Sequence, residues 1–356
     1  MADRMKLGLS VGYSGASMRV PIDEIRQAEA LGYDSIWTAE AYGSDAFSPL
    51  AYIAAQTDRI RLGTGVIQLA ARTPANAAMT AATIDAMAGD DRVILGIGVS
   101  GPQIVEGWYG QPWGRPNRRI REYCDIIRAI WRREEPVAYE GREFQLPYQG
   151  EGTLGLGKPL KSILHMNPNL PIWLGTGTEA NVKLTAEIAD GWLPLGFVPG
   201  GMKTFEPWLS TGFERAQKRT GEAKSLKDLE IQVALPVMIT DDIGEAFRQM
   251  KPNVALYVGG MGHRDKNFHN DMMVRRGYPD AAKTIQELYL DGRKGEAMEA
   301  VPDEYLDEQS LVGPVERIRE RYKAWEDSGA TGLTVRTSQS EAMELMAELT
   351  GANRGS

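Results

Sequence analysis

The feature that most constrains this fold is a regular alternation of short apolar runs with longer helix-like stretches. Parallel neighbouring strands require helical crossovers, so the alternation predicts a parallel sheet. The eight runs that predict strands cover residues 5–11, 35–40, 60–67, 92–99, 171–177, 190–195, 229–239 and 331–337. Helices are expected over 20–31, 48–58, 74–88, 116–132, 178–189, a long segment to about 221, most of 241–327, and 340–350.

Eight such strands predict an α/β fold of the (β/α)8 TIM-barrel type, with an open doubly wound sheet as the structural alternative. We expect one domain over residues 1–356. Two stretches exceed ordinary connections and are interpreted as insertions. The first, 136–170, follows the fourth helix and is rich in Gly and Pro, which predicts a short hairpin and a loop. The second, 262–310, precedes the eighth strand, is mostly helical and is a candidate lid.

Composition excludes several classes of protein. Forty basic and 48 acidic residues give a formal net charge of −8, which argues against a nucleic-acid partner because such binders present a basic face. The single cysteine, Cys124, excludes an internal disulfide and a CxxC zinc site, and a buried helical position is its expected role. Neither a signal peptide nor an apolar run of about 18 residues is present, so we expect a cytoplasmic protein without a membrane partner.

Candidate active-site residues are those that follow the predicted strands, because barrel active sites lie at the carboxyl ends of the strands. Glu40 is the best-placed carboxylate, although a structural acceptor or a solvated charge is an equal reading. The other candidates are Tyr13, Ser14, Tyr42, Asp45, Gly65, Val66, Gln68, Ser100, Gly101, Pro102, Gln103, Gly175, Thr176, Gly177, Thr178, Leu195 and Phe197.

Glycines mark several of these strand ends. In the segment Gly175–Thr178 they permit close backbone approach to a ligand, and Thr178 is placed to cap a helix whose free N–H groups favour an anion. An ordinary glycine turn is the alternative. The segment lacks the P-loop and GxGxxG patterns. Gly63 and Gly65 weaken an apolar strand unless a bulge or a ligand needs the space, which is a weak hint of function.

The histidines, serines and clustered aromatic residues do not predict a specific catalytic chemistry. His165, His263 and His269 lack metal-ligand spacing, so no metal site is expected. No GxSxG nucleophile motif occurs. The aromatic cluster of Trp108, Tyr109 and Trp113 is equally consistent with a pocket wall and with packing of a loop.

An ordered set of motifs resembles the luciferase-like monooxygenase superfamily, in its branch of coenzyme F420-dependent oxidoreductases. The resemblance extends over about residues 5–350, and within the branch it is closer to methylene-reductase-like and actinobacterial reductases. It rests on DSIWTAEAYGSDAFSPL (34–50), IRLGTGVIQLAARTPANAAMTAATID (60–85), RVILGIGVSGPQIVEGWYG (92–110), GKPLK (157–161), PIWLGTGTE (171–179) and ADGWLP (189–194). The family fold is a TIM barrel with insertions.

The resemblance also implies residue roles. A non-prolyl cis peptide at Gly65–Val66 would lie behind the deazaflavin ring. The turn Gly175, Thr176, Gly177 and Thr178 would hold the phosphodiester, and Tyr13, Glu40 and Tyr42 would approach the ring. The ring and ribityl contacts would come from Gly98, Val99, Ser100, Gly101, Pro102 and Gln103.

The sequence departs from the sugar-phosphate dehydrogenases of this branch. Ala41 follows Glu40 where those enzymes carry a catalytic histidine, and residues 100–103 replace their glutamate, which argues against glucose-6-phosphate as substrate. If the reaction needs a proton donor or acceptor, the candidates are Glu40, Tyr13 and Glu106.

Three functions remain open at this point. The first is F420-dependent hydride transfer to or from an enone, imine or carbonyl compound, with 262–310 as a cover for the pocket. The second is an FMN-dependent monooxygenase. The third is a non-enzymatic cofactor-binding barrel, whose mouth would be sealed, for instance by Trp108 and Trp192.

F420 carries a lactyl-oligoglutamate tail that needs a basic exit path, whereas FMN needs a pocket for its terminal phosphate. The cations that would supply either are Arg72, Lys158, Lys161 and Lys183. Ala-rich helices near 51–55 and 75–82 and the resemblance itself suggest a homo-oligomer, with a small molecule as the substrate.

Overall fold

The chain forms a closed parallel barrel in the computed structural model, which describes residues 4–89 and 91–354. In these residues eight parallel strands close in the order β1, β2, β3, β5, β8, β9, β10 and β12, and β12 pairs again with β1. The β9–β10 pairing excludes the open sheet and confirms the predicted barrel. The strands are β1 (Lys6–Gly12), β2 (Ser35–Thr38), β3 (Arg61–Thr64), β5 (Val93–Gly98), β8 (Ile172–Thr176), β9 (Gly191–Pro194), β10 (Glu230–Ile239) and β12 (Gly332–Arg336).

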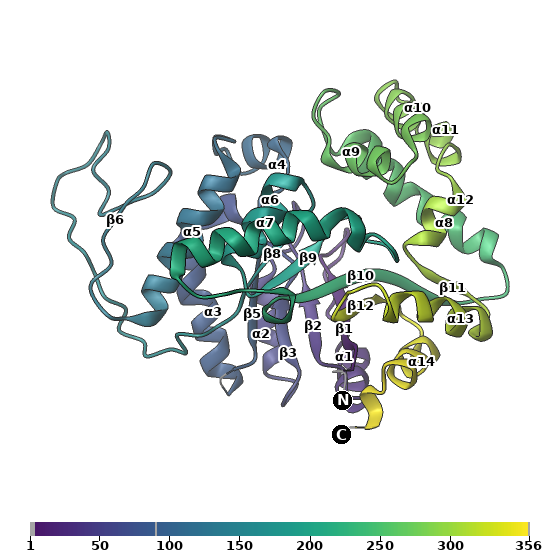
Figure 1. The fold of residues 1–356 in the computed structure, drawn as a ribbon, viewed down its shortest axis with the longest axis horizontal. Helices are drawn as coiled ribbons and strands as arrows, with labels where there is room; N and C mark the ends of the chain where they lie inside the picture. The colour runs from purple at the N-terminus through teal and green to yellow at the C-terminus, as the bar shows by residue number, and fades with distance from the viewer. Residues whose placement is uncertain (1–3, 90, 355–356) are drawn as a thin grey trace.

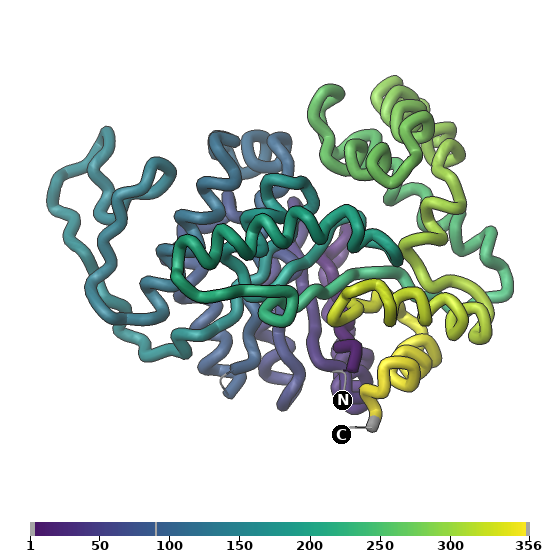
Figure 2. The backbone as a smooth tube through the Cα atoms, viewed as in Figure 1, coloured from purple at the N-terminus to yellow at the C-terminus, as the bar shows by residue number. Residues whose placement is uncertain are grey.

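Helices cover the outside of the barrel, and both described ends of the chain lie together below it (Figures 1 and 2). The helices that accompany the barrel strands are α1 (Ile22–Ala30), α2 (Phe47–Ala54), α3 (Pro74–Ala88), α5 (Pro116–Arg132), α6 (Glu179–Ile188), α7 (Met202–Thr220), α13 (Val315–Glu326) and α14 (Ser340–Thr350). The described chain contains no helix that is long and apolar enough to cross a membrane.

Short elements interrupt this pattern at several points. The predicted strand 60–67 is two strands, β3 and β4 (Ile67–Gln68), separated by Gly65 and Val66. Between α5 and β8 the chain forms the antiparallel pair β6 (Tyr139–Glu140) and β7 (Gln145–Leu146) within a long loop. The remaining short elements are η1 (Leu69–Ala71), α4 (Pro102–Gly107), η2 (Leu226–Asp228) and η4 (Ala352–Arg354).

A second helical layer is inserted between β10 and β12, and it lies at the upper right of Figure 1. It has a hydrophobic core of its own, which includes Phe247, Met273, Ile285 and Tyr305. The mostly helical prediction missed one strand here, because a run of three residues is too short to show strand periodicity. The elements are α8 (Ile243–Ala255), the π-helical turn η3 (Leu256–Gly260), α9 (Phe268–Arg275), α10 (Pro279–Leu290), α11 (Lys294–Glu299), α12 (Asp303–Glu308) and β11 (Leu311–Gly313).

Two tryptophans fill the interior of the barrel. Trp37 and Trp173 lie with ring centroids 5.1 Å apart, and both are buried. A Cβ at Gly63 would lie 2.5 Å from Cε3 of Trp37, and one at Gly191 would lie 2.3 Å from the Trp173 ring. The glycine at position 63 is therefore explained by packing against a large neighbour, which corrects its interpretation as a hint of function.

Candidate active site

Gly65 and Val66 form the upper rim of the barrel between β3 and β4. The peptide bond that joins them is cis, as the resemblance implied. Gly65 is exposed although the strand residues before it are buried, so its backbone faces the open carboxyl end of the barrel. The buried side-chain oxygen Oε1 of Gln68, two residues after Val66, has no hydrogen-bond partner among the described residues. This rim therefore combines the exposed backbone of Gly65 with an unpaired hydrogen-bond acceptor, Oε1 of Gln68.

The side chain of Val66 joins three strand ends. A Cβ at Gly98, at the end of β5, would lie 2.4 Å from Cγ2 of Val66, and one at Gly175, in β8, would lie 2.9 Å from Cγ1. The Val66 side chain therefore requires a glycine at two of the predicted site positions. This contact brings Gly65, Val66, Gly98 and Gly175 to one place.

Glu40, the second residue after β2, is buried, and its carboxylate is fully engaged. It accepts hydrogen bonds from the backbone N–H of Ala46 at 3.0 Å and of Gln68 at 2.7 Å. It also forms an ion pair with Arg72, which lies 3.7 Å from Asp45 as well. Burial alone would lower the pKa of Arg72, but the bond to Glu40 raises it. This arrangement favours a role for Glu40 in holding the loop after β2 against β4, and its catalytic role stays a prediction.

The loop after β5 connects the rim to the inserted helices. Ser100 adopts a left-handed backbone conformation with φ of 59°, and Gly101 next to it is buried. A Cβ at Gly101 would lie 3.7 Å from the Phe268 ring and 3.8 Å from the Met261 carbonyl oxygen. The adjoining residues Val99, Pro102 and Gln103 remain at least partly accessible at the carboxyl end of β5.

Glu106 is directed differently from the other candidates. It is exposed on α4 and accepts a hydrogen bond from the backbone N–H of Trp113 at 3.2 Å. Tyr109 donates to the Ala41 carbonyl oxygen at 3.0 Å, and Lys266 lies 5.3 Å from the centre of the Trp113 ring. These contacts fasten the segment after α4 to its neighbours, and they give Glu106 a structural partner.

The turn before α6 holds part of its own backbone. The side-chain oxygen of Asn181 accepts from the N–H groups of Gly177 and Thr178 at 3.2 and 2.8 Å. Those two donors are therefore in use. The N–H groups of Glu179 and Ala180 have no acceptor among the described residues. The donors left free for the predicted anion are therefore those in the first turn of α6, one or two residues further along the chain.

A polar group at the opposite side of the mouth joins the predicted Tyr13 to Tyr257, a residue that the sequence analysis missed. The hydroxyls of Tyr13, after β1, and Tyr257, in η3, lie 3.0 Å apart, and Tyr13 is 38% exposed. Burial raises the pKa of Tyr257, so this hydroxyl stays protonated near neutral pH. His269 packs edge-on against the Tyr257 ring at 4.7 Å between centroids, and burial lowers its pKa to about 4.

Arg336, the last residue of β12, completes this group. Close surrounding protein lowers the pKa of its guanidinium, and the neighbouring hydroxyls of Tyr257 and Tyr13 oppose that shift. The residue is nevertheless exposed to solvent. It forms no ion pair within the described chain. Arg336 could have been predicted, because it lies at the end of the eighth predicted strand. No sequence pattern marked Tyr257.

Burial and side-chain positions bear on three other expectations. Trp192 is fully buried against Phe205 and Trp108 is 63% exposed, so neither seals the mouth, which removes the particular closure suggested for a non-enzymatic barrel. Cys124 is buried, and burial raises its pKa to about 12. Within residues 4–89 and 91–354, no cluster of three His, Cys, Asp or Glu side chains is placed to hold a metal.

The model of the luciferase-like monooxygenase family matches residues 5–332. The chain belongs to the luciferase-like monooxygenase family. A Mycobacterium tuberculosis relative named "Putative coenzyme F420-dependent oxidoreductase" is 46% identical to it over 347 residues, which are 97% of this chain and 99% of the relative.

Solved structures show the same fold for this luciferase-like chain. The coenzyme F420-dependent tetrahydromethanopterin reductase of Methanopyrus kandleri aligns with a TM-score of 0.77 at 22% identity, over 98% of each chain. An F420-dependent secondary alcohol dehydrogenase in complex with an F420-acetone adduct aligns with a TM-score of 0.73 at 16% identity, over 99% of each chain. At these identities the likeness concerns the fold alone.

Proposed function

We propose that this protein is a coenzyme F420-dependent oxidoreductase that moves a hydride between C5 of the deazaflavin and an organic substrate. The observation that carries the proposal is the 46% identity, over nearly the whole of both chains, to a relative whose name describes that activity. Enones, imines and carbonyl compounds are the substrate classes, because each has a carbon that accepts a hydride. The cofactor supplies that hydride, and the protein supplies binding, orientation and exclusion of water.

The residues at the mouth fit such a cofactor. A planar ring with N–H groups can lie on the exposed Gly65–Val66 backbone and donate to the unused Oε1 of Gln68. The segments Gly98–Gln103 and Gly175–Thr178 flank this position through their contact with Val66. The free N–H groups in the first turn of α6 suit the phosphodiester. Arg72 is committed to Glu40 and is therefore a poor phosphate ligand.

Among the three candidate proton donors, we place this role at Tyr13. Its hydroxyl is accessible, and Tyr257 at 3.0 Å can hold it in position. Reduction of a carbonyl compound leaves negative charge on oxygen, and a proton from Tyr13 would neutralise it. Tyr13→Phe is expected to lower kcat about 100-fold, within the usual range for general acid catalysis. F420 affinity, measured by titration, should stay within a factor of about two, and an unchanged kcat would remove Tyr13 from the mechanism.

The segment from η3 to α9, residues 256–275, would cover the substrate. It touches the ends of three barrel strands, through Tyr257 on Tyr13, Phe268 beside Gly101, and Met272 against Gly196. A cover of this kind keeps water away from the reacting centre and shapes specificity. The unpaired Arg336 beneath it would favour a substrate with an anionic or strongly polar group.

The proposal is tested by turnover. Purified protein, reduced F420 and a panel of enones, imines and ketones are mixed, and reoxidation of the deazaflavin is followed by its visible absorbance. We expect substrate-dependent reoxidation that needs the protein. Oxygen consumption with reduced FMN would instead support the monooxygenase, and tight F420 binding without turnover on any class would support a binding protein.

We also propose a homo-oligomer, with a contact surface that differs from the one first expected. The alanines of α3 are buried inside the chain, where Trp131 donates to the Ala78 carbonyl oxygen. The outer face of α2 and α3 instead exposes Tyr52, Met79 and Met87, by 53%, 57% and 66%. Such a group of large apolar side chains suits a subunit contact. Light scattering on the purified protein checks this, and a monomer at all concentrations would contradict it.

A further inference from the structure

Arg336 lies on the inner face of the barrel, as the alternation of side chains along β12 indicates. Two residues earlier in β12, Thr334 accepts a hydrogen bond from the Gln232 side chain at 3.1 Å. Gln232 is inside the barrel, because a Cβ at Gly8 would lie 3.0 Å from its Nε2 and 2.8 Å from Nε1 of Trp37. Side chains two residues apart in a strand share a face, so Arg336 also points inward, at the carboxyl end of β12.

Solvent reaches the inner face of the barrel beside this strand. Ala234 in β10 is exposed, although Val233 and Leu235 next to it are buried. It pairs in register with Thr334 and lies on the same face of the sheet. Ala234 carries only a methyl group, so the inner face stays accessible at the level just before Arg336.

Arg336 is an unpaired cation at this side of the mouth. Its guanidinium forms no ion pair and donates no hydrogen bond within residues 4–89 and 91–354. The titratable groups that act on it are the hydroxyls of Tyr257 and Tyr13, and phenols are uncharged near neutral pH. Burial lowers the pKa of His269, which packs on Tyr257, to about 4, so its ring adds no charge. One cation among neutral polar groups suits a ligand with a single negative charge.

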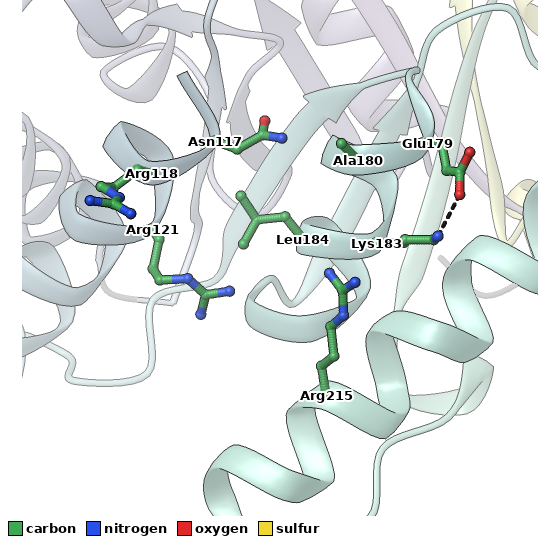
Figure 3. Close-up of a pocket in the computed structure, with 8 residues that line it drawn as sticks. All are labelled: Asn117, Arg118, Arg121, Glu179, Ala180, Lys183, Leu184 and Arg215. Carbon is green, nitrogen blue, oxygen red and sulfur yellow. Dashed lines mark hydrogen bonds and ion pairs between the residues drawn. The ribbon is translucent and has the colours of Figure 1, made fainter. Parts of the chain in front are cut away.

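The cations outside the barrel form a different group. Arg118, Lys183 and Arg215 line a cavity of about 590 Å³ between α5, α6 and α7 (Figure 3). These side chains come from helices that pack around the barrel, whereas Arg336 comes from the inner face of a strand. Of these cations, Arg336 is the one that lies beside the proposed proton donor, Tyr13.

We propose that the substrate is an oxo acid whose carboxylate is bound by Arg336. The inference rests on the proposed function and names its substrate class. A guanidinium presents two parallel N–H donors, which match the two oxygens of a carboxylate. The ketone oxygen lies at Tyr13, and Tyr13 and Arg336 are neighbours. The carboxylate is therefore only a few bonds from the carbonyl carbon.

The reaction of such a substrate balances with the groups already described. The hydride of reduced F420 forms the new C–H bond at the carbonyl carbon, and the deazaflavin is oxidised. The carbon–oxygen π bond breaks, and its oxygen takes the proton of the Tyr13 hydroxyl, which solvent then replaces. The product is the corresponding hydroxy acid. Arg336 holds the carboxylate throughout and exchanges no proton.

The test pairs acids with neutral analogues of similar size. Pyruvate, acetoacetate and levulinate are each compared with their primary amides. Turnover with reduced F420 gives kcat and KM, and calorimetric titration of protein saturated with oxidised F420, which has no hydride to give, provides Kd. For at least one pair we expect the wild type to favour the acid by about 30-fold in kcat/KM and in Kd, as is typical of a hydrogen bond between charged groups.

Two variants of Arg336 and one control assign this preference. Arg336→Gln should abolish it by raising KM and Kd for the acid, with kcat and the amide constants little changed. Arg336→Lys should keep part of it, because an ammonium keeps the charge but not the paired donors. Arg19→Gln is the matched control, since Arg19 is exposed in the loop after β1 at the same end of the barrel, and its constants should equal those of the wild type.

The outcomes separate this inference from the proposed function. Equal constants for every acid and its amide, turnover of neutral ketones or enones alone, or an acid preference that survives Arg336→Gln would overturn the carboxylate site while the proposed function stands. An acid preference in binding without any turnover would keep the site and overturn the hydride transfer. Failure to bind F420 would overturn the proposed function and the substrate assignment together.

Discussion

The side chains at the mouth of the barrel fall into two groups. Some stabilise the fold through their contacts, and others remain accessible to a substrate or cofactor. Glu40 belongs to the first group, since two backbone donors and Arg72 occupy its carboxylate. Tyr13 and Arg336 belong to the second, since both are accessible. From sequence position alone, Glu40 was a stronger catalytic candidate than Tyr13. An acidic residue at a strand end looks the same in the sequence whether or not its carboxylate oxygens are already hydrogen-bonded.

Replacement of Glu40 by glutamine should mainly affect stability. The variant keeps the shape of the side chain but takes from the partly buried Arg72 its nearer counter-charge and leaves only Asp45 at 3.7 Å, and such a loss costs about 2–4 kcal/mol. Urea unfolding measures this free energy. Glu106→Gln, at an exposed position, should change it by less than about 1 kcal/mol. A Glu40→Gln protein of normal stability with no turnover would instead identify Glu40 as the catalytic acid or base.

His269 should make stability depend on pH. An unfolded histidine takes up a proton below about pH 6.5, whereas the folded one remains neutral down to about pH 4. The unfolded state therefore binds more protons in this window, and stability falls as the pH falls. Between about pH 7.5 and about pH 5 we expect the wild type to lose about 2 kcal/mol more than His269→Gln. Parallel losses in the two proteins, measured by urea unfolding, would show that His269 is not buried as described.

The candidate site is built from the ends of barrel strands. Glycine recurs at these ends for two different reasons. Gly63 makes room for Trp37 inside the barrel, and Gly98 and Gly175 make room for Val66 at its rim. Gly65 alone among these is exposed. A sequence shows the glycine but not the large neighbour that requires it, because that neighbour comes from a different strand.

The contact between Gly98 and Val66 predicts a specific coupling. Gly98→Ala places a Cβ 2.4 Å from Cγ2 of Val66, and such overpacking costs about 1–3 kcal/mol. Val66→Ala removes the clashing atom, so the double variant should recover about 1 kcal/mol or more relative to the sum of the single variants. Gly15→Ala, where a Cβ meets nothing within 4 Å, is the control. Additive losses in urea unfolding would refute the contact.

On the scale of the whole molecule, the alternation of strands and helices was sufficient to predict the closed barrel. The inserted layer was harder, since β11 is only three residues long and the core around Phe247 and Tyr305 is local to that layer. Site residues that directly follow barrel strands could be predicted from the sequence. Residues of the inserted segment that contact the barrel mouth could not. Tyr13 and Tyr257 are 244 residues apart, and no local pattern joins them.

The central claim is that the barrel mouth binds a deazaflavin, and a direct titration tests it best. Purified apoprotein is titrated with F420 and, separately, with FMN, while tryptophan fluorescence is followed. We predict micromolar or tighter binding of F420, with FMN bound at least about tenfold more weakly. Equal or tighter binding of FMN would contradict the account and direct the search to oxygen-consuming reactions.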